Sequence, residues 1–113
     1  MSPRGWEFRI QDIIGAINRI LKLTQGKRFE DFADEETIVE AVLWNFMIMG
    51  EAAANLPAEI YQKHPDIPWR DMRDQRNFVA HEYYEISLRI LWKTITDDLP
   101  PLIPQLENLL KES

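Results

Sequence analysis

The apolar residues of this chain recur every three or four positions, and this spacing restricts the fold more than any other feature. In the first segment the recurring positions are Ile10, Ile13, Ile14, Ile17, Ile20 and Leu21, and the pattern ends near Gly26. An α-helix has 3.6 residues per turn, so residues at this spacing line one face. No stretch alternates apolar and polar residues for long, and the hairpin dipeptides Asn-Gly and Asp-Gly are missing from the sequence. We therefore predict an all-α fold whose first helix covers about residues 6–24.

The second predicted helix, about residues 35–55 with Asp34 as its cap, is apolar on all sides in its middle. Eight of the nine residues in Ala41–Met49 are apolar, and Asn45 is the exception. Such a helix must be covered on more than one side, and we expect a second subunit to supply the extra cover. The alternative is that Trp44 and Met47 lie under the connector 27–35, whose Phe29 and Phe32 are expected to pack against the core. The apolar run is too short to span a membrane.

Prolines divide the rest of the chain. A short helix over Ala58–Lys63 is expected between Pro57 and Pro65. Pro68 favours the first turn of a third helix, Trp69–Glu82. Ser87 is a candidate cap for a fourth helix over about residues 88–98. Pro100 and Pro101 should break or kink that helix, and Pro104 fits the first turn of a last helix that ends near Lys111. The result is an up-down bundle of four or five helices, with residues 1–113 as one domain.

Charge and composition limit the classes of function. The formal net charge is −6 and the chain has no cysteine. The charge argues against broad, nonspecific nucleic-acid binding, so an RNA-binding surface must find its cations in one place. The missing cysteines exclude disulfides and thiolate zinc sites. The first residues carry charge where a secretory signal would be apolar, which together with the short apolar run favours a cytoplasmic protein without a membrane partner.

Cations do gather in one segment, which also contains a histidine. Arg70, Arg73 and Arg76 are spaced by three residues and share one side of the third predicted helix. Asn77 and His81 are four residues apart and share a face. Metal-free RNA cleavage needs a base for the 2′-hydroxyl, which histidine supplies near neutral pH, and a fixed cation for the phosphate, which arginine supplies. The alternative is an ion-paired helix face in which His81 is a core residue.

Other chemistries find less support. His64 lies in a proline-rich connector and is expected to be an exposed loop residue. Two histidines seventeen residues apart, without cysteine, lack a zinc-ligand spacing, so we expect no metal site. No serine stands in a nucleophile motif, and no glycine-rich phosphate loop is present, so no cofactor is expected.

The stretch Arg76-Asn-Phe-Val-Ala-His81-Glu-Tyr83 resembles the signature of HepT-like proteins in the HEPN superfamily. The resemblance extends over about residues 8–110 through the surrounding segments Ile67-Pro-Trp-Arg-Asp-Met-Arg, Leu91-Trp92, Asp98-Leu99-Pro100, Gly50-Glu51-Ala52, Phe29–Phe32 and Ala41-Val42. It implies a helical homodimer in which two signatures face each other across a cleft. It also implies metal-independent endoribonuclease activity, with Arg76 and His81 as catalytic residues and Asn77 as their polar neighbour.

The same resemblance implies a toxin–antitoxin pair. The expected antitoxin is an MntA-like minimal nucleotidyltransferase, which transfers AMP onto the signature tyrosine, here Tyr83. The RNA path would use Arg70, Arg73 and Arg76, extended by Lys63, Arg89 and Lys93, and Glu51 is expected to form a structural ion pair with one of the arginines. The alternative function is a non-catalytic helical dimer that binds a nucleotidyltransferase partner or a nucleotide.

Overall fold

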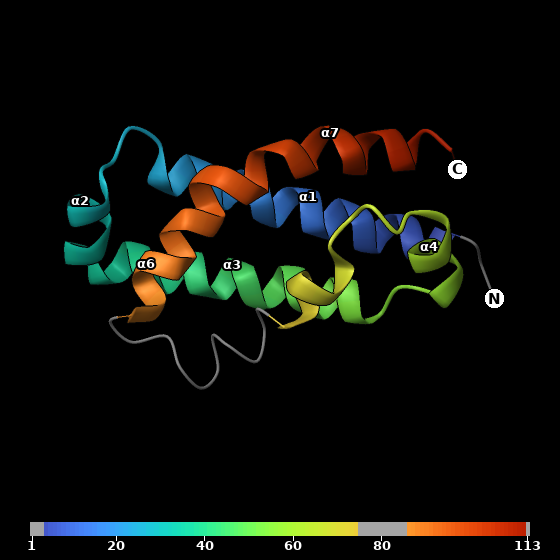
Figure 1. The fold of residues 1–113 in the computed structure, drawn as a ribbon, viewed down its shortest axis with the longest axis horizontal. Helices are drawn as coiled ribbons and strands as arrows, with labels where there is room; N and C mark the ends of the chain where they lie inside the picture. The colour runs from blue at the N-terminus through green and yellow to red at the C-terminus, as the bar shows by residue number, and fades with distance from the viewer. Residues whose placement is uncertain (1–3, 75–85, 113) are drawn as a thin grey trace.

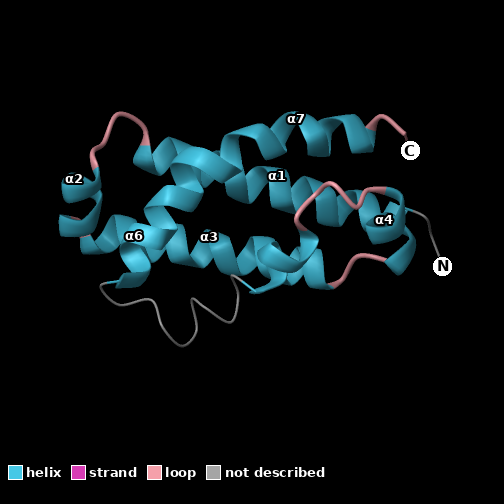
Figure 2. Cartoon of the chain, viewed as in Figure 1, coloured by secondary structure: helices cyan, strands magenta, loops and turns pink. Residues whose placement is uncertain are grey.

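The computed structural model describes residues 4–74 and 86–112, and this part of the chain contains helices and no strand (Figure 2). The all-α prediction is therefore confirmed. The elements are α1 (Arg4–Thr24), α2 (Phe29–Asp34), α3 (Glu36–Ala54), α4 (Ala58–Lys63), a helical segment over 69–74, α6 (Ile86–Lys93), a π-helical turn (Thr94–Asp98) and α7 (Leu99–Leu110).

Two long helices form the frame of the molecule. Helices α1 and α3 lie side by side in opposite directions, and α7 packs against α1 (Figure 1). Four isoleucines of α1 are fully buried, as their spacing predicts, and they meet Val42 and Phe46 of α3 in one core cluster: Ile10, Ile13, Ile17 and Ile20. Ile14 and Leu21 are half-buried against this cluster. Burial of such aliphatic and aromatic side chains stabilises the fold by about 1.5–3 kcal/mol per residue.

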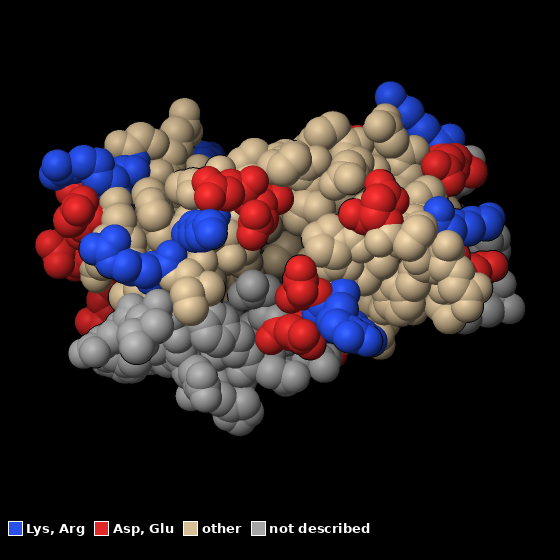
Figure 3. Space-filling model, in the orientation of Figure 1, with Lys and Arg blue, Asp and Glu red and all other residues tan. Residues whose placement is uncertain are grey.

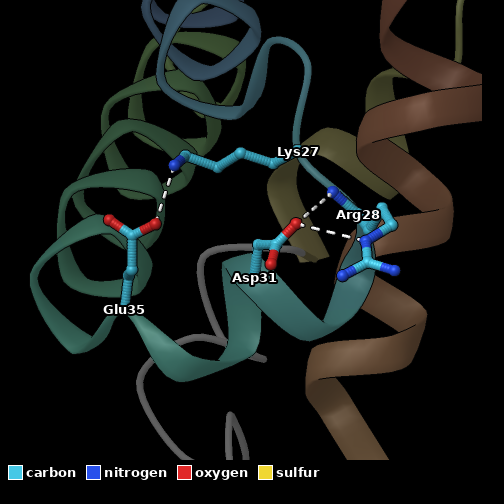
Figure 4. Close-up of polar contacts among 4 residues, drawn as sticks. All are labelled: Lys27, Arg28, Asp31 and Glu35. Carbon is cyan, nitrogen blue, oxygen red and sulfur yellow. Dashed lines mark hydrogen bonds and ion pairs between the residues drawn. The ribbon is translucent and has the colours of Figure 1, made fainter.

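The predicted connector after α1 contains a short helix, α2. Phe32 is fully buried with its ring 5.0 Å from the ring of Trp92, so the connector packs against the core as expected. Two ion pairs bracket α2 (Figure 4): Lys27 Nζ lies 2.7 Å from Glu35 Oε1, and Arg28 Nε lies 3.4 Å from Asp31 Oδ2. The backbone N–H of Arg28 also donates to Asp31 Oδ2, and this bond is the main reason that the pKa of Asp31 is lowered.

The start of α3 differs from the prediction. Asp34 is the last residue of α2, and Glu35 occupies the position before α3 without a capping hydrogen bond from its side chain. Asp34 therefore does not cap α3, because α2 extends to the residue where the cap was expected. At the other end α3 stops at Ala54, before Pro57, as predicted.

The C-terminal elements also correct the prediction. Helix α6 begins at Ile86, so Ser87 lies within the helix and is not its cap. The chain stays helical through the π-helical turn into α7, with Pro100 and Pro101 in the first turn of α7 and Pro104 inside it. A proline ring clashes with the carbonyl four residues earlier, and a π-helical turn widens the helix at that point. Of the two outcomes expected for these prolines, a break or a kink, the structure shows no break: the helix continues through the π-helical turn.

Helix α3 is long and apolar enough to cross a membrane by length and composition. Half of its apolar 18-residue stretch is buried inside the structure. Because the core helix of a soluble protein passes the same test, this result is weak support for a membrane span.

One face of α3 remains uncovered in the single chain. The side chain of Trp44 is 63% exposed, whereas Met47 is half-buried. The alternative in which Trp44 lies under the connector is therefore wrong. Phe8 of α1 is also exposed, at 55%.

Candidate functional site

Two of the six predicted site residues lie in the described part of the chain. Arg70 and Arg73 belong to the helical segment 69–74, where the third helix was predicted to begin. Arg76, Asn77, His81 and Tyr83 lie outside the described residues, so the meeting of Arg76 and His81 stays a prediction.

Trp69 and Met72 anchor the segment that leads into the signature. Pro68 stands directly before it, and its carbonyl accepts the N–H of Met72 at 3.1 Å. The buried indole of Trp69 donates its Nε1–H to the carbonyl of His64 at 2.9 Å, and Met72 is buried on the same segment. These contacts fix the helix axis just before Arg76.

Arg73 is held by an aromatic contact. Its guanidinium carbon lies 5.8 Å from the centroid of the Tyr61 ring, which itself packs 5.7 Å from the Trp69 ring. The Tyr61 hydroxyl donates to the carbonyl of Ala53 at the end of α3. Tyr61 on α4 is thus tied to both α3 and the segment 69–74, and it orients Arg73. Arg70 on the same segment is exposed.

The predicted cationic surface of Arg70, Arg73 and Arg76 has acidic neighbours. Asp71 and Asp74 alternate with the arginines on the segment, and both line a cavity of about 600 Å³ together with Asp97 and Asp98. Figure 3 shows acidic side chains on either side of a hollow on this face, with basic side chains beside the acidic groups on both sides. Sequence reasoning missed this cavity. The signals were the spacing of Asp71 and Asp74 on one helix and the Asp97-Asp98 pair before two prolines.

The additional cations of the expected RNA path do not all lie together. Lys63 lies on α4 and Lys93 on α6, and these helices lie toward opposite ends of the long axis (Figure 1). The Arg89 guanidinium carbon lies 4.2 Å from the centroid of the Phe29 ring, at the α2 end. Glu51 is exposed on α3, and its predicted pairing with an arginine stays a prediction.

His64 corrects the expectation of an exposed loop residue. Its side chain is only 18% exposed, and its Nε2 lies 3.2 Å from Glu112 Oε1 after α7. The connector therefore packs against the C-terminal end of the chain. Over residues 4–74 and 86–112, no group of three or more histidine and carboxylate side chains is placed to hold a metal ion.

Comparisons with known proteins bear on the resemblance. Residues 13–109 match the family described as Ribonuclease HepT-like. The chain is 38% identical to "Probable ribonuclease HepT" of Thermococcus cleftensis over 108 residues, covering 96% of this chain and 98% of the relative. It is 31% identical over 111 residues to a protein of Caldanaerobacter subterraneus subsp. tengcongensis named as a candidate RNase, covering 98% of this chain and 96% of the relative. No solved structure gives a significant match.

The family match covers most of the chain, and both relatives align over nearly their whole lengths. The match includes the anchored segment 69–74, the signature that follows it, all of α3 and most of α1 and α7. The resemblance seen in the signature is thereby confirmed. The chain belongs to the HepT-like ribonuclease family.

Proposed function

We propose that this protein is a metal-independent endoribonuclease that cleaves RNA with Arg76 and His81 at the interface of a homodimer. Membership in the HepT-like ribonuclease family carries the proposal, because the family match includes the Arg76-to-His81 signature. The anchoring of the segment 69–74 by Trp69 supports it, since a catalytic arginine two residues after this segment needs a fixed starting point.

The chemistry follows from the two side chains. Neutral His81 accepts the proton of the RNA 2′-hydroxyl, and the 2′-oxygen attacks the adjacent phosphorus. The bond from phosphorus to the 5′-oxygen breaks, and this oxygen takes a proton from the second histidine of the dimer. The products are a 2′,3′-cyclic phosphate and a 5′-hydroxyl end. Arg76 stays charged throughout and stabilises the negative charge that develops on the phosphoryl oxygens.

The uncovered face of α1 and α3 supports the dimer. Trp44 and Ile48 of α3 lie together with Arg9 and Asp12 of α1 around one shallow cavity of about 280 Å³. A two-fold axis through this face would bury both copies of Trp44, and the face carries charges of both signs, Arg9 and Asp12, that two copies could pair. Such a self-complementary surface is what an isologous dimer needs.

We also propose the biological setting. The protein acts in the cytoplasm as a single-domain toxin, and its antitoxin is an MntA-like minimal nucleotidyltransferase that transfers AMP onto Tyr83. A bulky anion two residues from His81 would repel RNA phosphates and so silence the toxin.

RNA cleavage by purified protein in the presence of a chelator tests the proposal. The wild type is expected to cleave a labelled RNA, while His81→Ala and Arg76→Ala lower the rate by about 100-fold or more. His64→Ala is the matched control, because it removes the chain's other histidine and leaves the signature intact. Cleavage by His81→Ala at the wild-type rate, or a wild type that requires a divalent metal, would contradict the proposal.

The second candidate is a non-catalytic dimer that binds the nucleotidyltransferase or a nucleotide, and the acidic cavity favours the protein-binding form of this candidate. Four aspartates beside the arginine stripe oppose a wide RNA footprint. This candidate predicts partner binding without RNA cleavage, and unchanged growth when the protein is expressed alone. If expression of the wild type slows growth and the His81→Ala variant allows normal growth, this second candidate is excluded.

A further inference from the structure

The cavity between the segment 69–74 and the α6–α7 junction has an apolar floor. Met49 of α3, Met72, Leu99 and Leu102 are all buried and line it, together with Pro68 and Pro101. At about 600 Å³ it falls within the range of ligand pockets, roughly 300–1,000 Å³. The four buried side chains are at most 5% exposed, so the apolar surface that another apolar group could cover favourably belongs mainly to the exposed Pro68 and Pro101 at the edge of the cavity.

The rim of this cavity is acidic, and no lysine, arginine or histidine of residues 4–74 and 86–112 lines it, although basic side chains lie beside its acidic groups on the surface (Figure 3). Asp71 and Asp74 stand on one side, and Asp97 and Asp98 stand on the other. None of the four forms an ion pair with a described lysine, arginine or histidine. The one hydrogen bond to their carboxylates is donated by the neighbouring Thr96 hydroxyl, at 3.2 Å from Asp97 Oδ1. Carboxylates on two sides of one hollow would both attract a cation placed between them.

A large apolar side chain extends the floor outward. Ile90 of α6 also lines the cavity, and it is 50% exposed. The surface that needs cover is therefore wider than the cavity itself. It combines an apolar centre with a charged edge, which is the arrangement of a protein-binding surface.

Charge and shape together select the occupant. RNA is excluded because its phosphates would meet four carboxylates. A polyamine supplies cations but leaves the apolar floor uncovered, and a single alkylammonium ion supplies one charge for four carboxylates. A peptide segment with alternating aliphatic and basic side chains satisfies both demands. We infer that this cavity docks a basic, aliphatic segment of a partner protein.

Three blocked hexapeptides provide the probes: alternating Leu-Arg, alternating Leu-Glu, and alternating Ser-Arg. Full-length protein with ¹³C-labelled methionine methyl groups reports the position of binding, because Met49 and Met72 line the cavity while Met47 lies on the Trp44 face. The Leu-Arg peptide is expected to shift the Met49 and Met72 signals and leave Met47 unchanged. It should bind more tightly than either of the other peptides, and added salt should weaken it.

Two matched variants each remove four negative charges, one at the cavity and the other outside it. The first replaces the four cavity aspartates by asparagine, at positions 71, 74, 97 and 98, and is expected to weaken Leu-Arg binding by about tenfold. The second replaces four exposed glutamates outside the cavity by glutamine: Glu30, Glu40, Glu59 and Glu107. It should bind the peptide as the wild type does. Circular dichroism confirms that both variants stay folded, and the salt dependence of the wild type gives a second measurement that needs no variant.

Three results would overturn the inference: equal affinity for the Leu-Arg and Leu-Glu peptides, equal weakening by both sets of substitutions, or shifts at Met47 in place of Met49 and Met72. The inference does not depend on RNA cleavage. An inactive ribonuclease with a working cavity, and an active ribonuclease without one, are distinguishable outcomes of the two assays.

Discussion

The Nε of Arg19 on α1 donates a hydrogen bond of 2.7 Å to the Oδ1 of Asn45 on α3. The amide nitrogen of Asn45 donates in turn to the carbonyl of Ala41, one turn earlier, at 2.8 Å. Asn45 is buried, and it is the polar residue that interrupts the apolar run of α3. Its role is therefore to join the two framework helices, because a buried amide that lost these partners would be costly.

Asn45→Ala should lower the free energy of unfolding by about 1–3 kcal/mol, since it removes both hydrogen bonds and leaves a small cavity. Arg19→Ala should cost less, because Arg19 is exposed and water replaces part of its interaction. Urea denaturation of the two single variants and the double variant measures the coupling energy, expected at about 0.5–1.5 kcal/mol. Strictly additive effects would show that the two side chains do not interact in solution.

The helices of this chain are largely predictable because their apolar spacing is local information. The isoleucines of α1 and the prolines around α4 place these elements within a few residues of the structure. Partners are less predictable, because they depend on how distant helices meet. The sequence shows Asn45 as the polar residue that interrupts the apolar run of α3. Its partner Arg19, 26 positions earlier, is identified only by the packing of α1 on α3. The contact between Tyr61 and Arg73 is likewise identified only by the packing of α4 against the segment 69–74.

Pro104 shows why the end of the bundle was mispredicted. A proline typically marks the first turn of a helix, yet Pro104 lies in the middle of α7. Leu99, Leu102, Leu106 and Leu109 lie on both sides of it and are all buried. Their spacing forms one continuous apolar face, so the packing of α7 outweighs the loss of one backbone hydrogen bond. The proposed catalytic residues Arg76 and His81 are predicted from a sequence signature, which is local information and does not specify their geometry.

Trp44→Glu should convert the proposed dimer to a monomer. A carboxylate at the centre of the interface would be buried without a partner, which is strongly unfavourable. Analytical ultracentrifugation over a range of protein concentrations measures the change. Ile90→Glu is the matched control, because Ile90 is also a large exposed apolar residue but lies on α6, at the acidic cavity. If Trp44→Glu stays as dimeric as the wild type, the interface lies elsewhere.

Tyr61→Leu should weaken RNA binding through Arg73. Loss of the ring removes the contact that orients the guanidinium, so the effect should resemble that of Arg73→Ala. Each variant is expected to reduce the slope of log Kd against log salt concentration by about 0.7, the value for one phosphate contact on a single strand. The rate of the cleavage step should change little at saturating RNA.

Two controls accompany the Tyr61 measurement. Tyr61→Phe keeps the ring and loses only the hydroxyl bond to Ala53, so it should retain the wild-type salt slope. Lys111→Ala removes an exposed cation after α7 and should leave RNA binding unchanged. An unaltered slope in both Tyr61→Leu and Arg73→Ala would mean that Arg73 does not contact RNA.

Asp31 should make stability depend on pH at the start of α2. The backbone N–H of Arg28, followed by its side chain, lowers the pKa of Asp31 below the ordinary value of 3.8. A lowered pKa in the folded state means that the stabilisation is complete above the unfolded pKa and is lost as the pH falls through the folded pKa. The wild type should therefore be more stable than Asp31→Asn at neutral pH, and the difference should shrink below about pH 4.

Thermal unfolding between pH 3 and 7 measures this effect, with Glu107→Gln as a control for the loss of one exposed negative charge. A stability difference between wild type and Asp31→Asn that stays constant over this range would indicate that the carboxylate charge is not responsible.

Tyr83 should carry AMP after co-expression with an active minimal nucleotidyltransferase. In this reaction the phenol oxygen attacks the α-phosphorus of ATP, pyrophosphate leaves, and the phenol proton passes to solvent or to a base of the transferase. Intact-mass measurement should show one added adenylyl group in the wild type. Tyr83→Phe should abolish the addition, and Tyr84→Phe, which changes the adjacent tyrosine, should retain it.

The adenylylated protein should cleave RNA more slowly than the unmodified protein, because the added phosphate is an anion close to the proposed phosphate site. Modification that persists in Tyr83→Phe but disappears in Tyr84→Phe would move the acceptor by one residue, and an unchanged mass beside an active transferase would remove this mode of control.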